Sequence, residues 1–125
     1  MKENIILDKS FEFAIRVVNL HKHLCNDHKE YTLSKQLLRS GTSIGANINE
    51  AQAAQSKKDF IAKMSIASKE ARESKYWIEL LIKTEYLDKD DEHTKSLLDE
   101  SYELIRLLTS IIKSTQVNEQ QSIKN

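Results

Sequence analysis

The stretch Phe60–Leu81, FIAKMSIASKEARESKYWIELL, repeats apolar or small residues at alternating steps of four and three. The repeat positions are Phe60, Met64, Ala67, Ala71, Ser74, Ile78 and Leu81. Three heptads with this spacing are typical of a helix that packs along a continuous seam. The helix is expected to follow an N-cap at Ser56 or Asp59 and to continue to about Leu87.

Three further segments, at about residues 8–27, 32–55 and 88–115, also have helical periodicity. The first is expected to start at an N-cap at Asp8 or Ser10, and the second at Thr32. The core stripe of the first segment is expected at Phe11, Ala14, Ile15, Val18 and Cys25, flanked by Phe13, Val17, Leu20 and Leu24. The other two segments carry Leu33, Leu37, Ile44, Ile48 and Ala51, and Leu97, Leu98, Leu104, Ile105, Ile111 and Ile112.

Both glycines of the chain, Gly41 and Gly45, fall inside the second segment. A glycine in a helix interior is destabilising by about 1 kcal/mol relative to alanine, so a break over residues 39–45 is one interpretation. We favour a continuous helix, because the apolar phase passes through the glycines unshifted. The glycines are then expected to face the alanines of the third segment, where the two helices would approach most closely.

The chain has 125 residues with no proline, two glycines and one cysteine. Because turns draw on proline and glycine, many-stranded β folds are excluded, and one cysteine excludes an internal disulfide framework. We expect an all-α antiparallel up-down-up-down four-helix bundle, with residues 1–116 as a single domain and 117–125 as a disordered polar tail. No apolar run has the length of a membrane span or a signal peptide core, so we expect a cytoplasmic protein without a membrane partner.

The sequence offers little catalytic chemistry. The glycines lack the spacing of a phosphate-binding loop, and the Glu-x-x-His pairs of di-iron bundles are absent. His21, Cys25 and His28 have spacing that could hold zinc, with His23 or His93 as a fourth ligand. The favoured interpretation is a buried cysteine beside histidines at a helix C-terminus. We therefore expect no catalytic, cofactor or metal site, and no enzymatic activity.

The net charge of zero hides an uneven distribution along the chain. Residues 29–87 carry ten basic and seven acidic groups, whereas residues 88–116 carry four basic and seven acidic groups. The outer face of the third segment combines cations with an aromatic ring, a composition suited to phosphates and bases. The alternative is a solvated face held by Lys69–Glu73, Lys75–Glu79 and Glu79–Lys83 pairs. The candidate nucleic-acid-binding residues are Lys57, Lys58, Lys69, Arg72, Lys75 and Tyr76.

Two smaller groups of residues indicate contacts beyond the core. Ile66 and Trp77 lie on a secondary apolar face of the third segment, which predicts a subunit interface or simple core burial. In the second segment, Arg39, Asn47 and Glu50 lie near one helix face. A partly buried Glu50 would need a partner, expected on the third segment or on a neighbouring subunit. A polar network that fixes helix register is the favoured role, and a ligand contact is the alternative.

The runs LRSGTSIGANINEA at 38–51, SKKDF at 56–60 and ASKEARESKYW at 67–77 resemble a bacterial four-helix-bundle family associated with intervening sequences in 23S rRNA genes. They are also similar to the accessory variability proteins of diversity-generating retroelements. The most specific pattern is Arg-x-x-x-Ser-Ile-x-x-Asn-Ile-x-Glu, matched by Arg39, Ser43, Ile44, Asn47, Ile48 and Glu50.

The resemblance implies a homopentameric barrel of four-helix bundles, no enzymatic activity and a basic surface that contacts RNA or DNA. This chain has Ala51 where the family pattern has glycine, which favours an unbroken end to the second helix. It is also neutral, whereas the retroelement proteins are strongly basic. The leading hypothesis is a non-enzymatic homo-oligomer that binds nucleic acid. The alternative is an adaptor for a protein partner, such as a retroelement reverse transcriptase, docked on the acidic fourth segment or at the pore of the oligomer.

Overall fold

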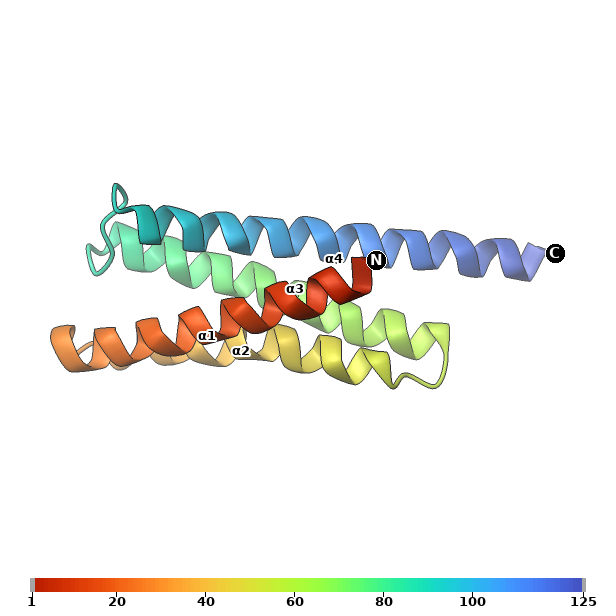
Figure 1. Cartoon of the computed structure of the whole chain (residues 1–125), viewed down its shortest axis with the longest axis horizontal. Coiled ribbons are helices and arrows are strands. Elements are labelled where there is room, and N and C mark those ends of the chain that lie inside the picture. Colours follow the sequence, from red (N-terminus) through yellow and green to blue (C-terminus); the bar gives the residue numbers. More distant parts are fainter. Residues whose placement is uncertain (1, 125) are drawn as a thin grey trace.

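The structure is a computed structural model that describes the backbone of residues 2–124 and the side chains of residues 5–118. It contains α1 (Lys2–His28), α2 (Leu33–Gln52), α3 (Lys57–Lys83) and α4 (Glu92–Lys124), with no strand among the described residues. Figure 1 shows the chain reversing direction between successive helices, so the all-α four-helix bundle is confirmed. None of these helices combines the length and hydrophobicity that crossing a membrane requires.

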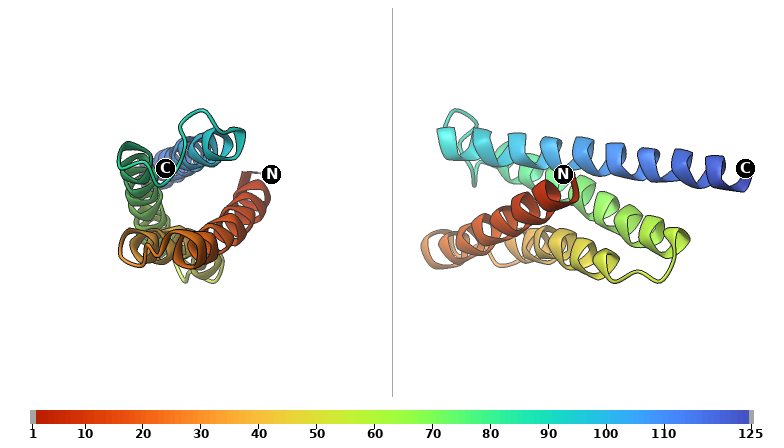
Figure 2. Two further views of the ribbon diagram at one scale, coloured as in Figure 1. Left: turned by 90° about the vertical axis from the view of Figure 1, so that its left-hand side faces the viewer. Right: turned by 45° about the vertical axis from the view of Figure 1, so that its right-hand side comes forward.

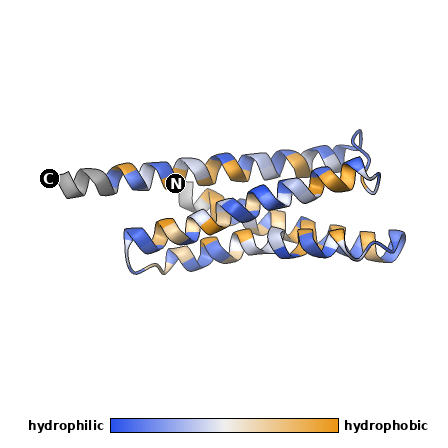
Figure 3. Ribbon diagram, turned by 180° about the vertical axis from the view of Figure 1, so that it is seen from behind, coloured by the Kyte–Doolittle hydropathy of each residue, from blue (hydrophilic) through white to orange (hydrophobic). Residues whose placement is uncertain are grey.

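The seam of α3 is confirmed as the centre of the core. Six of its seven positions are buried, and Phe60 packs against the core while partly exposed. The core also takes Leu37, Ile44 and Ile48 from α2 and Leu97, Leu104, Leu108 and Ile111 from α4. Apolar residues follow the inner sides of the helices, as Figure 3 shows by hydropathy.

The stripe predicted for α1 is wrong. The buried line is Ile6, Phe13, Val17 and Leu24, whereas Phe11 is 65% exposed and Ile15 is 47% exposed. Both lines have helical spacing, and the sequence pattern does not show which side of the helix meets its neighbours. The N-cap at Asp8 or Ser10 is also wrong, because helix α1 includes both residues and Ser10 is buried inside it.

The glycines of α2 face α1 and not α3. Helix α2 runs unbroken through Gly41, Gly45 and Ala51, as predicted. A Cβ added at Gly41 would lie 2.9 Å from both methyl carbons of Val17, and one at Gly45 would lie 3.4 Å from Oγ of Ser10. Facing α3, α2 presents Ser40, whose Oγ accepts a 2.9 Å hydrogen bond from Ser74. The predicted close approach is therefore present, but on the other neighbour.

A loop carboxylate replaces the expected cap at the start of α2, whereas α3 starts at one of its two expected caps. Thr32 makes no side-chain cap on α2. The Glu30 carboxylate accepts hydrogen bonds from the N–H groups of Thr32, Leu33 and Ser34 at 3.1, 2.8 and 2.7 Å. These bonds lower the pKa of Glu30 below its ordinary value, outweighing burial, which raises it. On α3, Ser56 is the N-cap and accepts from the N–H of Asp59 at 3.0 Å.

Helix α4 is longer than the sequence indicated. It continues to Lys124, past the boundary at residue 116 where a disordered tail was expected. The side chains from residue 119 onward, which include most of that predicted tail, lie outside the described residues. Figure 1 shows this end of α4 projecting beyond the other three helices.

Helix α1 meets α4 through charged side chains. Lys9 pairs with Glu103 at 3.0 Å. Arg16 pairs with Glu100 and also donates to the carbonyl of His93 at 2.9 Å. The helices are inclined to each other (Figure 2), and a groove of about 420 Å³ separates them near Leu20, Leu87 and Leu97.

Candidate nucleic-acid interface

The outer face of α3 carries most of the predicted basic residues. Lys57 and Lys58 are exposed at its N-terminal end, and Lys69 and Arg72 are exposed further along. Tyr76 is 57% exposed. Its ring packs edge-on against Trp77, with ring centroids 5.0 Å apart.

The ion pairs expected to neutralise this face form only in part. Lys75 lies 3.6 Å from Glu79, as the spacing predicted. No such pair joins Lys69 to Glu73, because the Glu73 carboxylate is taken by Arg39 of α2. Among the described side chains, none pairs with Lys57, Lys58, Lys69 or Arg72. Four cations on the α3 face therefore keep their charge available to an anion.

Lys75 stands apart from this set. It is partly buried, and its Nζ lies 4.8 Å from the centre of the Tyr102 ring on α4. Together with its pairing to Glu79, this cation–π contact directs the Lys75 side chain toward the α3–α4 boundary. Its role as a nucleic-acid contact stays a prediction, but its geometry is that of a bridge between two helices.

Arg39 joins α2 to α3. Its guanidinium donates to Glu73 at 2.5 Å and to Glu70 at 3.2 Å. The hydrogen bond with Glu73 is the main cause of the raised pKa of Arg39, and the same bond lowers the pKa of Glu73. Desolvation raises the pKa of Glu70. The structure thus places Arg39 in an inter-helix ion cluster.

The other residues of the predicted polar network follow Arg39 along α2. Ser43 donates to the carbonyl of Arg39 at 2.7 Å, and Asn47 donates to the carbonyl of Ser43 at 2.8 Å. Glu50 does not join this chain. It is exposed, so the expected need for a buried partner is absent, and its charge only helps to raise the pKa of Lys63.

Ile66 and Trp77 lie on the side of α3 that carries Glu70 and Glu73. Ile66 is 46% exposed, whereas Trp77 packs against the core and is only partly exposed. The Nε1 of Trp77 is buried without a hydrogen bond of normal geometry. It lies near the Glu73 carboxylate and contributes to the lowered pKa of Glu73. Their role at a subunit interface stays a prediction.

The histidine and cysteine residues of α1 divide into two groups. His21 lies 3.6 Å from Sγ of Cys25 and 3.1 Å from Oγ of Ser34. His23 pairs with Asp27 at 2.8 Å, and the His28 ring packs against the rings of His23 and Tyr86. Within the described part of the chain, no group of three or more His, Cys, Asp or Glu residues could hold a metal ion.

Sequence reasoning missed two features. The capping role of Glu30 was hidden because its carboxylate reaches forward to α2 from the loop. The exposure of Phe11 and Ile15 was hidden because their spacing matches that of a core stripe. The flanking charges give no signal, because Asp8 and Glu12 adjoin the exposed line while Lys9 and Arg16 adjoin the buried line through Phe13.

The model of the 23S rRNA-intervening sequence protein family matches residues 2–110. This chain belongs to that family. A crystal structure of a protein of the S23 ribosomal protein family from Bacteroides thetaiotaomicron, described as having unknown function, has 58% sequence identity to the chain. The match covers 90% of this chain and 99% of that one, with a TM-score of 0.87. No curated protein matches the chain.

Proposed function

We propose that this protein is a non-enzymatic, cytoplasmic homo-oligomer that binds structured nucleic acid through the outer face of α3. The observation that carries the proposal is the group of four exposed cations without ion-pair partners in the described part of the chain, Lys57, Lys58, Lys69 and Arg72. The family name connects its members to 23S rRNA genes and supports RNA as a ligand.

The physical basis is electrostatic. Cations that neutralise phosphates release counterions, so affinity falls steeply as salt rises. Tyr76, exposed beside Arg72, offers a ring on which an unpaired base can stack. A surface with few cations and one aromatic ring favours moderate affinity with little sequence preference.

The test is a binding titration with 23S rRNA fragments and duplex DNA at several salt concentrations. The double variant Lys58→Glu with Arg72→Glu is expected to lose at least about tenfold in affinity at about 50 mM salt, and to reduce the salt slope by about two. Lys35→Glu with Lys95→Glu changes the charge equally on α2 and α4 and is expected to retain affinity. Equal losses in both variants, or no binding of the wild type at low salt, would contradict the proposal.

The proposed assembly contains five copies, as the family resemblance implies. A small bundle with exposed apolar side chains on α1, α3 and α4 supports self-association. A solution mass near five chains is the expected result of sedimentation or native mass spectrometry.

A second candidate function is an adaptor for a basic protein partner. The supporting observation is a groove of about 510 Å³ on α4 lined by Asp99, Glu100 and Glu103 together with Arg106. Co-purification of a neighbouring gene's product, abolished by Asp99→Lys but not by Lys58→Glu, would favour this function over nucleic-acid binding.

A further inference from the structure

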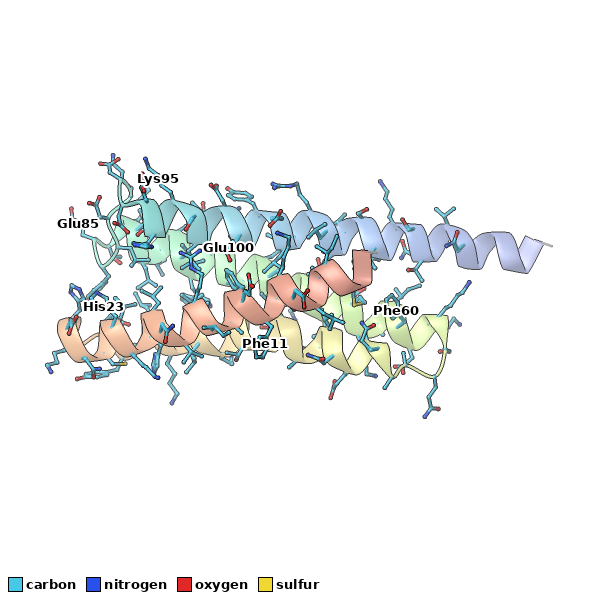
Figure 4. All side chains as sticks on the ribbon, viewed as in Figure 1. Phe11, His23, Phe60, Glu85, Lys95 and Glu100 are labelled. Atoms are coloured by element: carbon cyan, nitrogen blue, oxygen red, sulfur yellow. The ribbon has the colours of Figure 1, made fainter. Side chains whose placement is uncertain are left out.

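The ion pairs along α3 leave positive charge on its outer face. Each carboxylate of the helix already has a cation beside it. The pairs are Asp59–Lys63, Lys75–Glu79, Arg39–Glu70 and Arg39–Glu73. The exposed cations of α3 have no ion-pair partner among the described side chains, and they are Lys57, Lys58, Lys69, Arg72 and Lys83. Figure 4 labels Phe60 in the first turn of this helix and Glu85 just past its last turn.

These cations are unevenly spaced along the helix. Lys58 and Lys69 are separated by about three helical turns, or about 16 Å, and therefore point in nearly the same direction. Arg72 follows Lys69 by one turn. The outward positions between the two groups of cations are Ala62 and Ser65, which are exposed, short and uncharged. The face thus carries two groups of cations with a neutral span of short side chains between them.

Two separated groups of cations fit a duplex better than a single strand. The phosphates of a duplex form two rows with a groove between them, whereas those of a single strand follow one path. The short side chains of Ala62 and Ser65 let α3 lie close over a shallow groove but do not reach the base edges of a deep one. The minor groove of an RNA duplex is wide and shallow, and its 2′-hydroxyls are within the chemistry of the Ser65 hydroxyl.

Beyond Arg72 the outer face changes in character. Tyr76 follows one turn later, and its ring is 57% exposed while its edge-on contact with Trp77 holds it in place. Lys83 is exposed about 10 Å further along the same face. A ring with a cation on each side suits an unpaired base and its phosphates. The turn that follows α3 is mainly acidic, which limits the length of unpaired strand, and its carboxylates are Glu85, Asp88, Asp90 and Asp91.

We propose that α3 binds the junction between an RNA stem and an unpaired nucleotide that adjoins it. Lys58 contacts one phosphate row of the stem, and Lys69 with Arg72 contacts the other. The unpaired base stacks on Tyr76. The inference rests on the proposed nucleic-acid binding and names the kind of RNA that this face selects. A fully paired stem leaves the ring of Tyr76 unused, and a single strand does not present two phosphate rows.

The test compares labelled RNAs in binding titrations with the full-length protein at one salt concentration. The RNAs are a blunt stem, the same stem with a short unpaired extension at its 5′ or its 3′ end, and the single strand. One of the extended stems is expected to bind at least about fivefold more tightly than the blunt stem, and about tenfold more tightly than the single strand. A DNA stem with the same extension is expected to bind at least about fivefold more weakly than the RNA.

Three variants separate the two halves of the face. Tyr76→Ala is expected to abolish the gain from the extension and to leave blunt-stem affinity unchanged, whereas Tyr76→Phe keeps the gain. Tyr31→Ala is the matched control, because Tyr31 is 56% exposed and lies between α1 and α2. Lys58→Ala is expected to weaken stem binding about threefold or more and to leave single-strand affinity unchanged.

The outcomes distinguish this inference from the function on which it rests. Equal affinity for the three kinds of RNA, or a Tyr76→Ala variant that keeps the gain, would overturn the junction and leave nucleic-acid binding standing. Equal losses of stem and single-strand affinity in Lys58→Ala, or equal binding of the DNA and RNA stems, would overturn it as well. A wild type that binds none of these molecules at low salt would overturn the proposed function itself.

Discussion

Helix α1 is held by its two neighbours in different ways. Against α2 it meets Gly41 and Gly45, beside which Val17 and Ser10 respectively fill the space that a side chain would occupy. Against α4 it is joined by Lys9–Glu103 and Arg16–Glu100 pairs beside an open groove. The first contact depends on volume and the second on charge. The two sides of one helix should therefore respond to different perturbations, namely added methyl groups on one side and added salt on the other.

The largest effect is expected at Gly41. A Cβ there would lie 2.9 Å from both Val17 methyl carbons, so Gly41→Leu is expected to lower the free energy of unfolding by about 3 kcal/mol or more. Gly41→Ala gains about 1 kcal/mol of helix propensity but meets the same obstruction, and a net loss is expected. Denaturant unfolding measures both.

Gly45 is the matched control within the same contact. Its added Cβ would meet Oγ, the carbonyl oxygen and the carbonyl carbon of Ser10 at 3.4, 3.6 and 3.7 Å, which are ordinary contact distances. Gly45→Ala is therefore expected to be neutral or to stabilise by up to about 1 kcal/mol through helix propensity. If both alanine variants had the same effect, the closeness of Val17 to Gly41 would not be the limiting feature of the α1–α2 contact.

The next effect concerns the connection between α1 and α2. Glu30 is buried, and its ionised form is stabilised by three backbone N–H groups, so its pKa in the folded state lies below the ordinary value of 4.5. A lowered pKa contributes stability that is present above the unfolded pKa and lost as pH falls through the folded one. Glu30→Gln is expected to destabilise by about 1–2 kcal/mol at neutral pH.

The measurement is the free energy of unfolding from about pH 7 down to pH 3. Wild type is expected to lose stability below the ordinary carboxyl pKa, and Glu30→Gln to lose less over that range. Glu85→Gln, which removes an exposed carboxylate, serves as the control and should follow the wild type. A Glu30→Gln curve parallel to the wild type down to the lowest pH would mean that the carboxylate does not cap α2 in its ionised form.

A smaller effect is expected on the α4 side of α1. Arg16→Ala removes a partly exposed ion pair and a hydrogen bond to the His93 carbonyl, for a loss of about 1 kcal/mol. Lys9→Ala removes a more exposed pair and should lose less. The difference between Arg16→Ala and wild type is expected to shrink in high salt, because salt screens exposed charges. A salt-independent loss would instead indicate that the packing of the Arg16 side chain is what holds α1.

The two contacts of α1 also show what the sequence can and cannot reveal. The α3 seam was predicted in full because its heptads run unbroken from Phe60 to Leu81. The continuity of α2 followed from the unshifted apolar phase. The sequence did not show which neighbouring helix the two glycines face, because Gly41 and Gly45 have no side chain to mark a face. For α1, two apolar lines of equal spacing compete, and only the positions of α2 and α4 select the one through Phe13.

The candidate site was predictable in the same uneven way. The exposed positions of Lys58, Lys69 and Arg72 follow from their place opposite the seam, and that of Lys57 from its place at the first residue of the helix. The pairing of Glu73 did not follow, because local spacing offered Lys69 four residues away while Arg39 on another helix took the carboxylate. Long-range ion pairs depend on helix register across the bundle, which no single-helix pattern contains.

The smallest effect is expected at the end of α3. Glu85 follows the C-cap Thr84 with φ of 68°, a left-handed conformation that favours glycine. Glu85→Gly is expected to stabilise by a few tenths of a kcal/mol, since relief of the strain is partly offset by the greater entropy of the unfolded chain.

Thr84 has an ordinary φ of −92°, so a glycine there relieves no backbone strain. Thr84→Gly only raises the conformational entropy of the unfolded chain and is expected to destabilise the protein. Thermal unfolding of the pair measures the difference. Tyr86 of this turn packs against His28 at the C-terminal end of α1, twelve residues beyond Arg16. Glu85→Gly is therefore also expected to leave the effects of Gly41→Ala and Arg16→Ala unchanged when combined with either. A combined effect that departs from the sum would mean that the α3–α4 turn and the α1 contacts are coupled through α4.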